Sequence, residues 1–198
     1  MGLPPEEQSS WTAALRGESA GFAEVFERHR DRVYCSALRL TGNVHDAEDV
    51  TAGAFLELWR RRKSVRIVDG SVLPWLLITT TNLARNLSRS LRRYRALIDS
   101  LPRSDSTRSA GEVALERVEV TVLAEQAGKA LASLAKSDAA LITLTAVEHY
   151  SPAQAAAALG ISEDAARTRL HRARTRMDAA LGAFVAESDT VSTKELDR

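Results

Sequence analysis

Five arginines crowd into one short segment near the end of the sequence, ARTRLHRARTRM at positions 166–177. On a helix that turns about 100° per residue, Leu170, Ala173 and Met177 share one face because they follow the i, i+3, i+7 rule. Arginines occupy the neighbouring face. One face of this helix can therefore pack against a core, while the other can bind anions. The five are Arg167, Arg169, Arg172, Arg174 and Arg176.

A second basic face is expected on a helix that begins near Pro74. A stripe of mostly apolar residues, spaced by three or four positions, should face a core, and four arginines fall on the opposite side. Residues 60–95 hold ten Arg or Lys against one acidic residue, whereas residues 1–59 hold five against ten, so the net charge of +1 is a cancellation between blocks. A solvated face would explain an ordinary basic run, but this imbalance favours phosphate binding. The stripe is Leu76, Thr80, Leu83, Leu87, Leu91 and Tyr94, and the arginines are Arg85, Arg89, Arg92 and Arg93.

No arrangement of residues points to catalysis. The sequence shows no Ser-His-Asp order, metal-ligand cluster or glycine-rich phosphate loop, so we expect no enzyme, no cofactor and no metal site. His171 has no Cys or second His at ligand spacing. Cys35 is the only cysteine, which excludes an internal disulfide and fits a reducing compartment. Because it lies between Tyr34 and Ser36 on a predicted apolar helix, we predict that Cys35 is a core residue rather than a nucleophile.

The N-terminal segment MGLPPEEQSS is acidic and polar. It lacks the basic start and apolar centre of a secretion signal. No apolar run approaches the roughly 20 residues of a membrane span. We therefore expect a cytoplasmic protein without membrane insertion.

Glycine and proline are sparse, and helical spacing recurs along nearly the whole chain, which predicts an all-α protein. Residues 98–112 are rich in Ser, Asp and Arg, the composition of a flexible linker. We expect two small helical domains, at 10–97 and 113–183, joined by this linker and followed by a polar tail at 184–198.

Capping residues predict where several helices begin and end. Asn43 is placed to cap a helix whose first turn is acidic. Ser151-Pro152 should start a short helix, Gly160 can end it in the left-handed conformation, and Ser162 can cap the arginine-rich helix that follows. A short helix, a glycine turn and an arginine-rich helix have the spacing of a helix-turn-helix.

Three stretches follow one another along the chain: FAEVFERHRDRVYCSALRLTGNVHDAEDVTAGAFLELWR, LPWLLITTTNLARNLSRSLRRYR and SPAQAAAALGISEDAARTRLHRAR. In this order they resemble the bacterial RNA polymerase sigma factors of the extracytoplasmic-function (ECF) group. The resemblance covers about residues 10–182. The tandem order is much more specific than the helix-turn-helix alone, which many regulators carry.

The resemblance implies a transcription initiation factor that binds core RNA polymerase, directs it to promoters and assists promoter melting. The N-terminal domain would bind polymerase and the minus-ten element, and the C-terminal domain would bind the minus-thirty-five element. An anti-sigma factor that holds such a protein inactive is usual in the family. Asp46, Glu48 and Asp49 match the family's polymerase contact, although acidic residues at a helix start are also ordinary helix chemistry.

The family recognises the minus-ten element as a single non-template strand, with one base flipped into a pocket formed by the PWLL helix and the loop before it. The family pattern places Asn82, which offers a donor and an acceptor, as the base contact. Trp75 is either a stacking partner for DNA or a core anchor. The phosphate contacts would be Arg85, Arg89, Arg92 and Arg93.

On the arginine-rich helix, the family pattern places four residues toward base edges or the adjacent backbone in the major groove. These four are Arg167, Thr168, His171 and Arg172. The remaining three, Arg169, Arg174 and Arg176, are expected to contact the DNA backbone or to form salt bridges.

The sequence departs from the family pattern at three pairs of residues. Ala52-Gly53 replaces Gln-Glu, Gln154-Ala155 replaces Glu-Ile, and Ala165-Ala166 replaces Thr-Val, which removes a threonine that often touches phosphate. A conventional DNA-binding regulator with a helical sensor domain would explain residues 151–178 equally well. It would leave the basic helix at 74–95 without a purpose, and binding to core polymerase separates the two hypotheses.

Overall fold

The computed structural model describes residues 5–100 and 118–196, and these are almost entirely helical. The described ranges contain no strand, only an isolated antiparallel bridge between Val68 and Ser71. The all-α prediction is therefore confirmed. Within the same ranges, no helix combines the length and the apolar character that crossing a membrane requires.

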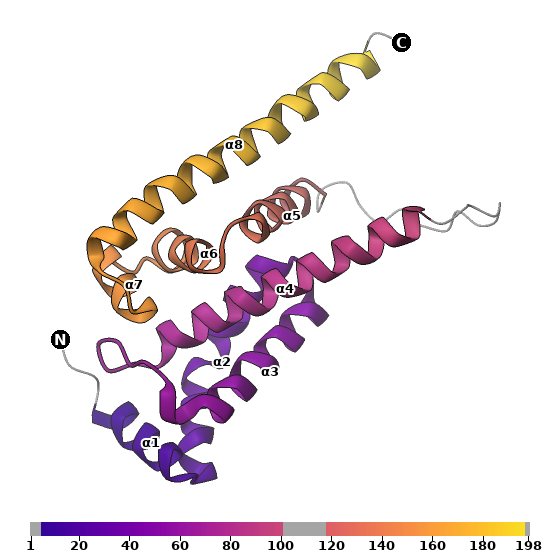
Figure 1. The fold of residues 1–198 in the computed structure, drawn as a ribbon. Coiled ribbons are helices and arrows are strands. Elements are labelled where there is room, and N and C mark those ends of the chain that lie inside the picture. The colour runs from indigo at the N-terminus through magenta and orange to yellow at the C-terminus, as the bar shows by residue number, and fades with distance from the viewer. Residues whose placement is uncertain (1–4, 101–117, 197–198) are drawn as a thin grey trace.

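The chain forms two helical units in sequence order (Figure 1). The N-terminal unit contains α1 (Pro5–Arg16), α2 (Ser19–Thr41), α3 (Val44–Arg61), the 3-10 turn η1 (Arg62–Ser64) and α4 (Leu73–Ser100). The C-terminal unit contains α5 (Val118–Ser133), α6 (Lys136–Ile142), the turn η3 (Thr143–Val147), α7 (Pro152–Leu159) and α8 (Glu163–Leu196).

Local capping chemistry places the helix ends where the sequence predicts them. The Asn43 side chain accepts a hydrogen bond from the backbone N–H of Asp46 at 3.1 Å and caps α3. Ser151 and Gln154 form a reciprocal capping box at the start of α7, and Gly160 ends that helix with φ +69°. The Ser162 hydroxyl accepts a hydrogen bond from the backbone N–H of Ala165 at 3.2 Å and caps α8. The helix-turn-helix is thus built from α7 and α8.

The core of the N-terminal unit lies between α2, α3 and α4, with α1 packed against α2. The approach of α1 to α2 depends on Gly21, where a Cβ atom would lie only 2.5 Å from the carbonyl oxygen of Ser10. The predicted apolar stripe of α3 is buried, together with Phe55. It consists of Ala47, Val50, Ala54 and Leu58.

A wide π-helical turn, η3, follows α6 in the C-terminal unit. The N–H of Glu148 donates to the carbonyl of Thr143, five residues earlier, at 3.0 Å. Such a turn holds one residue more than an α-helical turn. His149 then adopts φ +59° and directs the chain toward α7.

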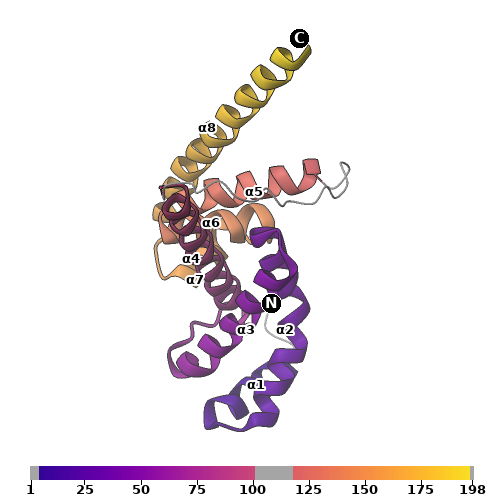
Figure 2. The same ribbon diagram turned by 90° about the vertical axis from the view of Figure 1, so that its right-hand side faces the viewer.

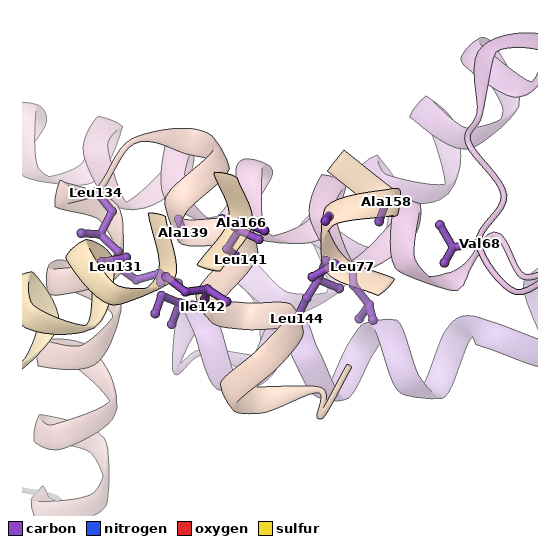
Figure 3. Close-up of a cluster of buried hydrophobic side chains, with 14 residues drawn as sticks. Val68, Leu77, Leu131, Leu134, Ala139, Leu141, Ile142, Leu144, Ala158 and Ala166 are labelled. Carbon is purple, nitrogen blue, oxygen red and sulfur yellow. The ribbon is translucent and has the colours of Figure 1, made fainter. Parts of the chain in front are cut away.

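The C-terminal unit packs directly on the N-terminal unit. Helix α4 contacts α5, α6, η3 and α7, and α2 contacts α5; α5 and α6 lie beside α4 in both views (Figures 1 and 2). The C-terminal part of α8 projects away from this body (Figure 1). Figure 3 shows the apolar cluster at the junction, where Val68 and Leu77 of the N-terminal unit join Leu131, Leu141 and Leu144 of the C-terminal unit.

The boundaries differ from the expected domain limits at two places. Helix α4 continues to Ser100, so the first residues of the predicted linker at 98–112 are helical, and the rest of that linker lies outside the described residues. The backbone of α8 continues as a helix to Leu196, through most of the segment expected to be a polar tail.

Four expected side-chain placements are wrong. Arg85, expected on the solvent side of α4, is only 2% exposed because the C-terminal unit covers it. Leu91 and Tyr94, expected to face a core, are exposed because α4 extends past the helices that it packs against. Cys35, expected in the core, is exposed, and the neighbouring Ser36 is buried instead.

Candidate nucleic-acid interface

Asn82 and Trp75 line one pocket on α4, and its other lining residues come from α3, α4 and α6 rather than from the loop before α4. The pocket has a volume of about 270 Å³, and Glu57, Arg61 and Lys136 are also among its lining residues. The Asn82 side-chain oxygen is buried and has no hydrogen-bond partner among the described residues. A buried amide oxygen without a partner is rare in folded proteins, because its lost hydration is not replaced. The pocket is therefore lined by a residue whose buried acceptor is unused.

The polar residues just before Asn82 on α4 differ from it, because their hydroxyl groups are paired. The threonines at 79–81 each donate the hydroxyl hydrogen to the carbonyl oxygen four residues earlier, at 2.8–3.0 Å. Their polar groups are satisfied within the helix. Asn82 follows directly and lines the pocket. Trp75 is half-buried and packs against the N-terminal core, so the same ring anchors α4 and forms part of the pocket.

The loop before α4 is held by a carboxylate from the first helix. Glu7 Oε1 accepts hydrogen bonds from His29 Nε2 at 2.8 Å, from the Ser71 hydroxyl at 3.0 Å and from the Val72 N–H at 3.1 Å. Glu7 and His29 are 4% and 5% exposed. Burial alone would raise the pKa of Glu7, but the hydrogen bond and charge of His29 and the other two donors outweigh it, and the pKa is lowered.

Sequence reasoning missed this role of Glu7. The residue lies in the segment PPEEQSS, whose composition indicates only a polar start. Its partners are 22, 64 and 65 positions away, so no local pattern could reveal them. The loop that they fix contains Asp69 at φ +47° and Gly70 at φ +77°, a conformation that needs such support.

The four arginines of α4 fall into two groups. Arg92 and Arg93 are exposed, and together with Arg89 they line an open groove of about 540 Å³. Arg89 also donates from Nε to the carbonyl oxygen of Ala132 at 3.0 Å. Arg85 makes its hydrogen bonds entirely with backbone carbonyls of the C-terminal unit among the described contacts. Burial, followed by the charges of Arg89 and Arg92, lowers the pKa of Arg85.

The arginines of α8 also divide into two groups. Leu170 and Ala173 are buried. Arg169 donates to the Ser137 hydroxyl at 2.8 Å, and Arg176 lies 4.0 Å from the carboxylate of Asp138. These two arginines fasten α8 to α6. The remaining candidates of this helix stay exposed, although Arg167 pairs with Glu163 at 2.6 Å; they are Arg167, Thr168, His171, Arg172 and Arg174.

The expected polymerase contact lies at the start of α3. Glu48 and Asp49 are exposed, and Asp46 is half-buried. Asp46 lines a hollow with Arg92 from α4 and Lys129 from α5. The structure therefore brings the acidic start of α3 close to one end of the basic groove.

Comparison with known proteins identifies the chain. The family model for Sigma-70 region 2 matches residues 25–94, and the model for Sigma-70 region 4 matches residues 124–177. Over 181 residues the chain is 31% identical to the ECF RNA polymerase sigma factor SigE of Mycolicibacterium smegmatis, covering 88% of this chain and 69% of SigE. The chain belongs to the ECF family of RNA polymerase sigma factors.

A second relative agrees with this assignment, and one solved structure agrees with the fold. The ECF sigma factor SigL of Mycobacterium tuberculosis is 29% identical over 166 residues, covering 82% of this chain and 89% of SigL. The structure of CnrH in complex with the cytosolic domain of CnrY has the same fold, with a TM-score of 0.55 at 23% identity over 90% of this chain and 98% of CnrH. Like its family, this sigma factor binds core RNA polymerase and directs it to promoters through region 2 (α2–α4) and region 4 (α5–α8).

Proposed function

We propose that this sigma factor assists promoter melting by holding one unpaired base of the minus-ten element in the pocket formed by Asn82 and Trp75. The observation that carries the proposal is the buried, unpartnered oxygen of Asn82. A flipped base must recover the few kcal/mol lost on unstacking. An amide that offers both an acceptor and a donor suits the edge of a base, and the indole of Trp75 supplies an adjoining apolar surface.

The exposed cations extend this pocket into a path for the DNA backbone. Arg89, Arg92 and Arg93 line the groove along α4 and would bind phosphates with release of counterions. Arg85 would join them only after the C-terminal unit moves away, because its guanidinium is now occupied by carbonyl groups. The acidic start of α3, with Asp46, would contact core polymerase.

Helix α8 would enter the major groove of the minus-thirty-five element. Its exposed face offers arginines suited to guanine and phosphate, together with Thr168 and His171. Arg174 would contact the DNA backbone. In this function the protein makes and breaks no covalent bond, and it acts beside RNA polymerase in the cytoplasm.

The decisive experiment uses Asn82→Ala with core polymerase and a promoter that the factor recognises. We expect a loss of permanganate reactivity in the melted region of about tenfold or more, with little change in closed-complex binding measured on duplex DNA. Ser90→Ala, an exposed change two turns further along α4, is the matched control and should behave as wild type. An equal loss of melting and of closed-complex binding would contradict the base pocket.

A further inference from the structure

Region 4 covers the surface of region 2 that the proposed function gives to the promoter. Helices α5 and α6 lie beside α4 (Figures 1 and 2). Lys136, at the start of α6, reaches the rim of the Asn82 pocket. Helix α7 meets the loop before α4, where the Gln154 amide donates to Asp69 at 2.6 Å and Arg66 donates to the carbonyl oxygen of Ala157 at 3.3 Å.

Arginines on the basic face of α4 bind the backbone carbonyl groups at the C-terminal end of α5. Arg85 donates to the carbonyl oxygens of Leu131 and Ala132, each at 3.2 Å, and to that of Leu134. The last carbonyls of a helix have no partner within the helix and attract cations. A guanidinium that is 2% exposed and bound to three carbonyls cannot also bind a phosphate. Region 4 and DNA are therefore alternative ligands of Arg85.

A buried carboxylate makes a second polar link between the regions. The Glu148 side chain, which follows η3 in region 4, has no exposed area. Both arginines that pair with it come from α2 of region 2, Arg32 at 2.7 Å and Arg39 at 3.3 Å. The hydrogen bond from Arg32 to Glu148 raises the pKa of Arg32. A buried carboxylate that loses its cations is strongly unfavourable, so Glu148 favours the packed arrangement of the two regions over a separated one with the same local structure.

The interface between the two regions also contains apolar packing, in addition to its ion pairs and hydrogen bonds. Leu77, on α4, has no exposed area and belongs to the same buried cluster as Leu131 and Leu144 of region 4 (Figure 3). The guanidinium of Arg66 also lies against Gly160. The surfaces are fitted to each other at both polar and apolar positions.

We propose that the free sigma factor inhibits itself by adopting a closed state, in which its own region 4 occupies the promoter surface of region 2 and the Glu148–Arg32–Arg39 group holds it there. The proposal rests on the proposed function for the identity of the α4 surface. Core polymerase or promoter DNA must displace region 4 before Arg85 and the Asn82 pocket become fully accessible. The closed state needs no second protein.

The test measures the distance between the regions in the free protein. Fluorophores are placed at His45→Cys at the start of α3 and at Ala135→Cys just after α5, both exposed positions, in a Cys35→Ser background; the neighbouring Asp46 and Lys129 line one hollow between the regions. We expect efficient energy transfer in the otherwise unchanged chain. Glu148→Arg places three cations together in a buried site and should lower the transfer at least about twofold. Adding Arg32→Glu and Arg39→Glu to that variant restores opposite charges and should restore most of the transfer.

Two controls keep the outcome clear. Arg30→Glu changes a charge on α2 whose ion pairs are local, and transfer should stay at its original value. Circular dichroism reports whether region 4 remains folded in Glu148→Arg. If it does not, the double variant Arg32→Glu/Arg39→Glu, which changes only half-exposed side chains of region 2, should open the chain with region 4 intact.

The proposal is overturned if Glu148→Arg and the double variant both transfer as efficiently as the original chain, or if the triple variant stays as low as Glu148→Arg. Because these measurements use neither polymerase nor DNA, they fail or succeed independently of the Asn82 experiment. A second measurement connects the two: core polymerase should bind folded Glu148→Arg with an apparent affinity at least about threefold higher, since a closed population no longer competes. An unchanged or lower affinity would contradict self-inhibition.

Discussion

Helices α4 and α8 carry similar rows of arginine, but the arginines of the two helices make different contacts. On α8, Arg169 and Arg176 contact residues of the neighbouring α6, and the other arginines are exposed. On α4, Arg85 and Arg89 bind the backbone of region 4 itself. The same residue type thus serves as a free binding surface on one helix and as an intramolecular contact on the other. Charge density alone does not indicate which ligand a basic face meets first.

The largest expected effect concerns the apolar side of α4. Leu77→Ala should lower the free energy of unfolding by about 2–5 kcal/mol, because it leaves a cavity in a core shared by both regions. Urea denaturation gives the value. Leu56→Ala, at a position 49% exposed, should change it by no more than about 0.5 kcal/mol. A small effect of Leu77→Ala would mean that the two cores are separate in solution.

The next effect distinguishes the two kinds of arginine on α8. Arg172→Ala should weaken binding to the minus-thirty-five element by about 1–3 kcal/mol in a sequence-dependent manner. Arg169→Ala, which removes the contact with Ser137, should mainly reduce the stability of region 4. Electrophoretic mobility shifts on matched and mismatched duplexes measure the first, and thermal unfolding measures the second. If both variants lose affinity equally on every duplex, the proposed division of this helix is wrong.

The starts of the two basic helices are stabilised by different groups. A carboxylate, Glu7, holds the loop before α4, and a hydroxyl, Ser162, caps α8, so only the first contribution should depend on pH. The pKa of Glu7 is lower in the folded protein than in the unfolded chain. Its contribution to stability is therefore fully present above the unfolded pKa, and it is lost as the pH falls through the folded pKa. Unfolding free energies measured from pH 7 to pH 3 should therefore fall less in Glu7→Gln than in the original chain. Ser162→Ala removes the cap of α8 and should cost about 1 kcal/mol at every pH. Parallel pH curves for Glu7→Gln and the original chain would exclude this role of Glu7.

The smallest expected effect is at Arg89. Arg89→Ala should weaken DNA binding almost equally for all sequences and reduce the slope of log K against log salt by about one. Titrations at several salt concentrations give the slope. A strong sequence preference in the loss would contradict a phosphate contact.

The fold was predictable wherever neighbouring residues determine it. Asn43, Ser151 and Gly160 fix helix ends through bonds to residues a few positions away, and the stripe of α3 follows directly from its spacing. Periodicity does not show where the partner of a helix ends, so the spacing places Leu91 and Tyr94 against a core that does not reach them. One step along a helix changes the direction of a side chain by about 100°, which is why Ser36 rather than Cys35 is buried.

The candidate site was predictable in part for the same reason. Asn82 and Trp75 lie on one helix, so their common pocket follows from the resemblance and from helical geometry. Arg85 has the same spacing as its exposed neighbours, and only the packing of region 4 separates it from them. Glu148 stands in the sequence as a single acidic residue, and its partners are more than 100 positions away.

The number of residues in the wide turn at 143–147 determines whether region 4 can pack on region 2 in the closed state. With one residue fewer in TLTAV, the segment could continue as an ordinary α-helix, and every side chain after it would be rotated by about 100° around the helix axis. The carboxylate now enclosed between two arginines of α2 would then point elsewhere. Insertion or deletion of a single residue in this turn would therefore change how easily the closed state opens. It would do so without substituting any residue proposed to contact DNA.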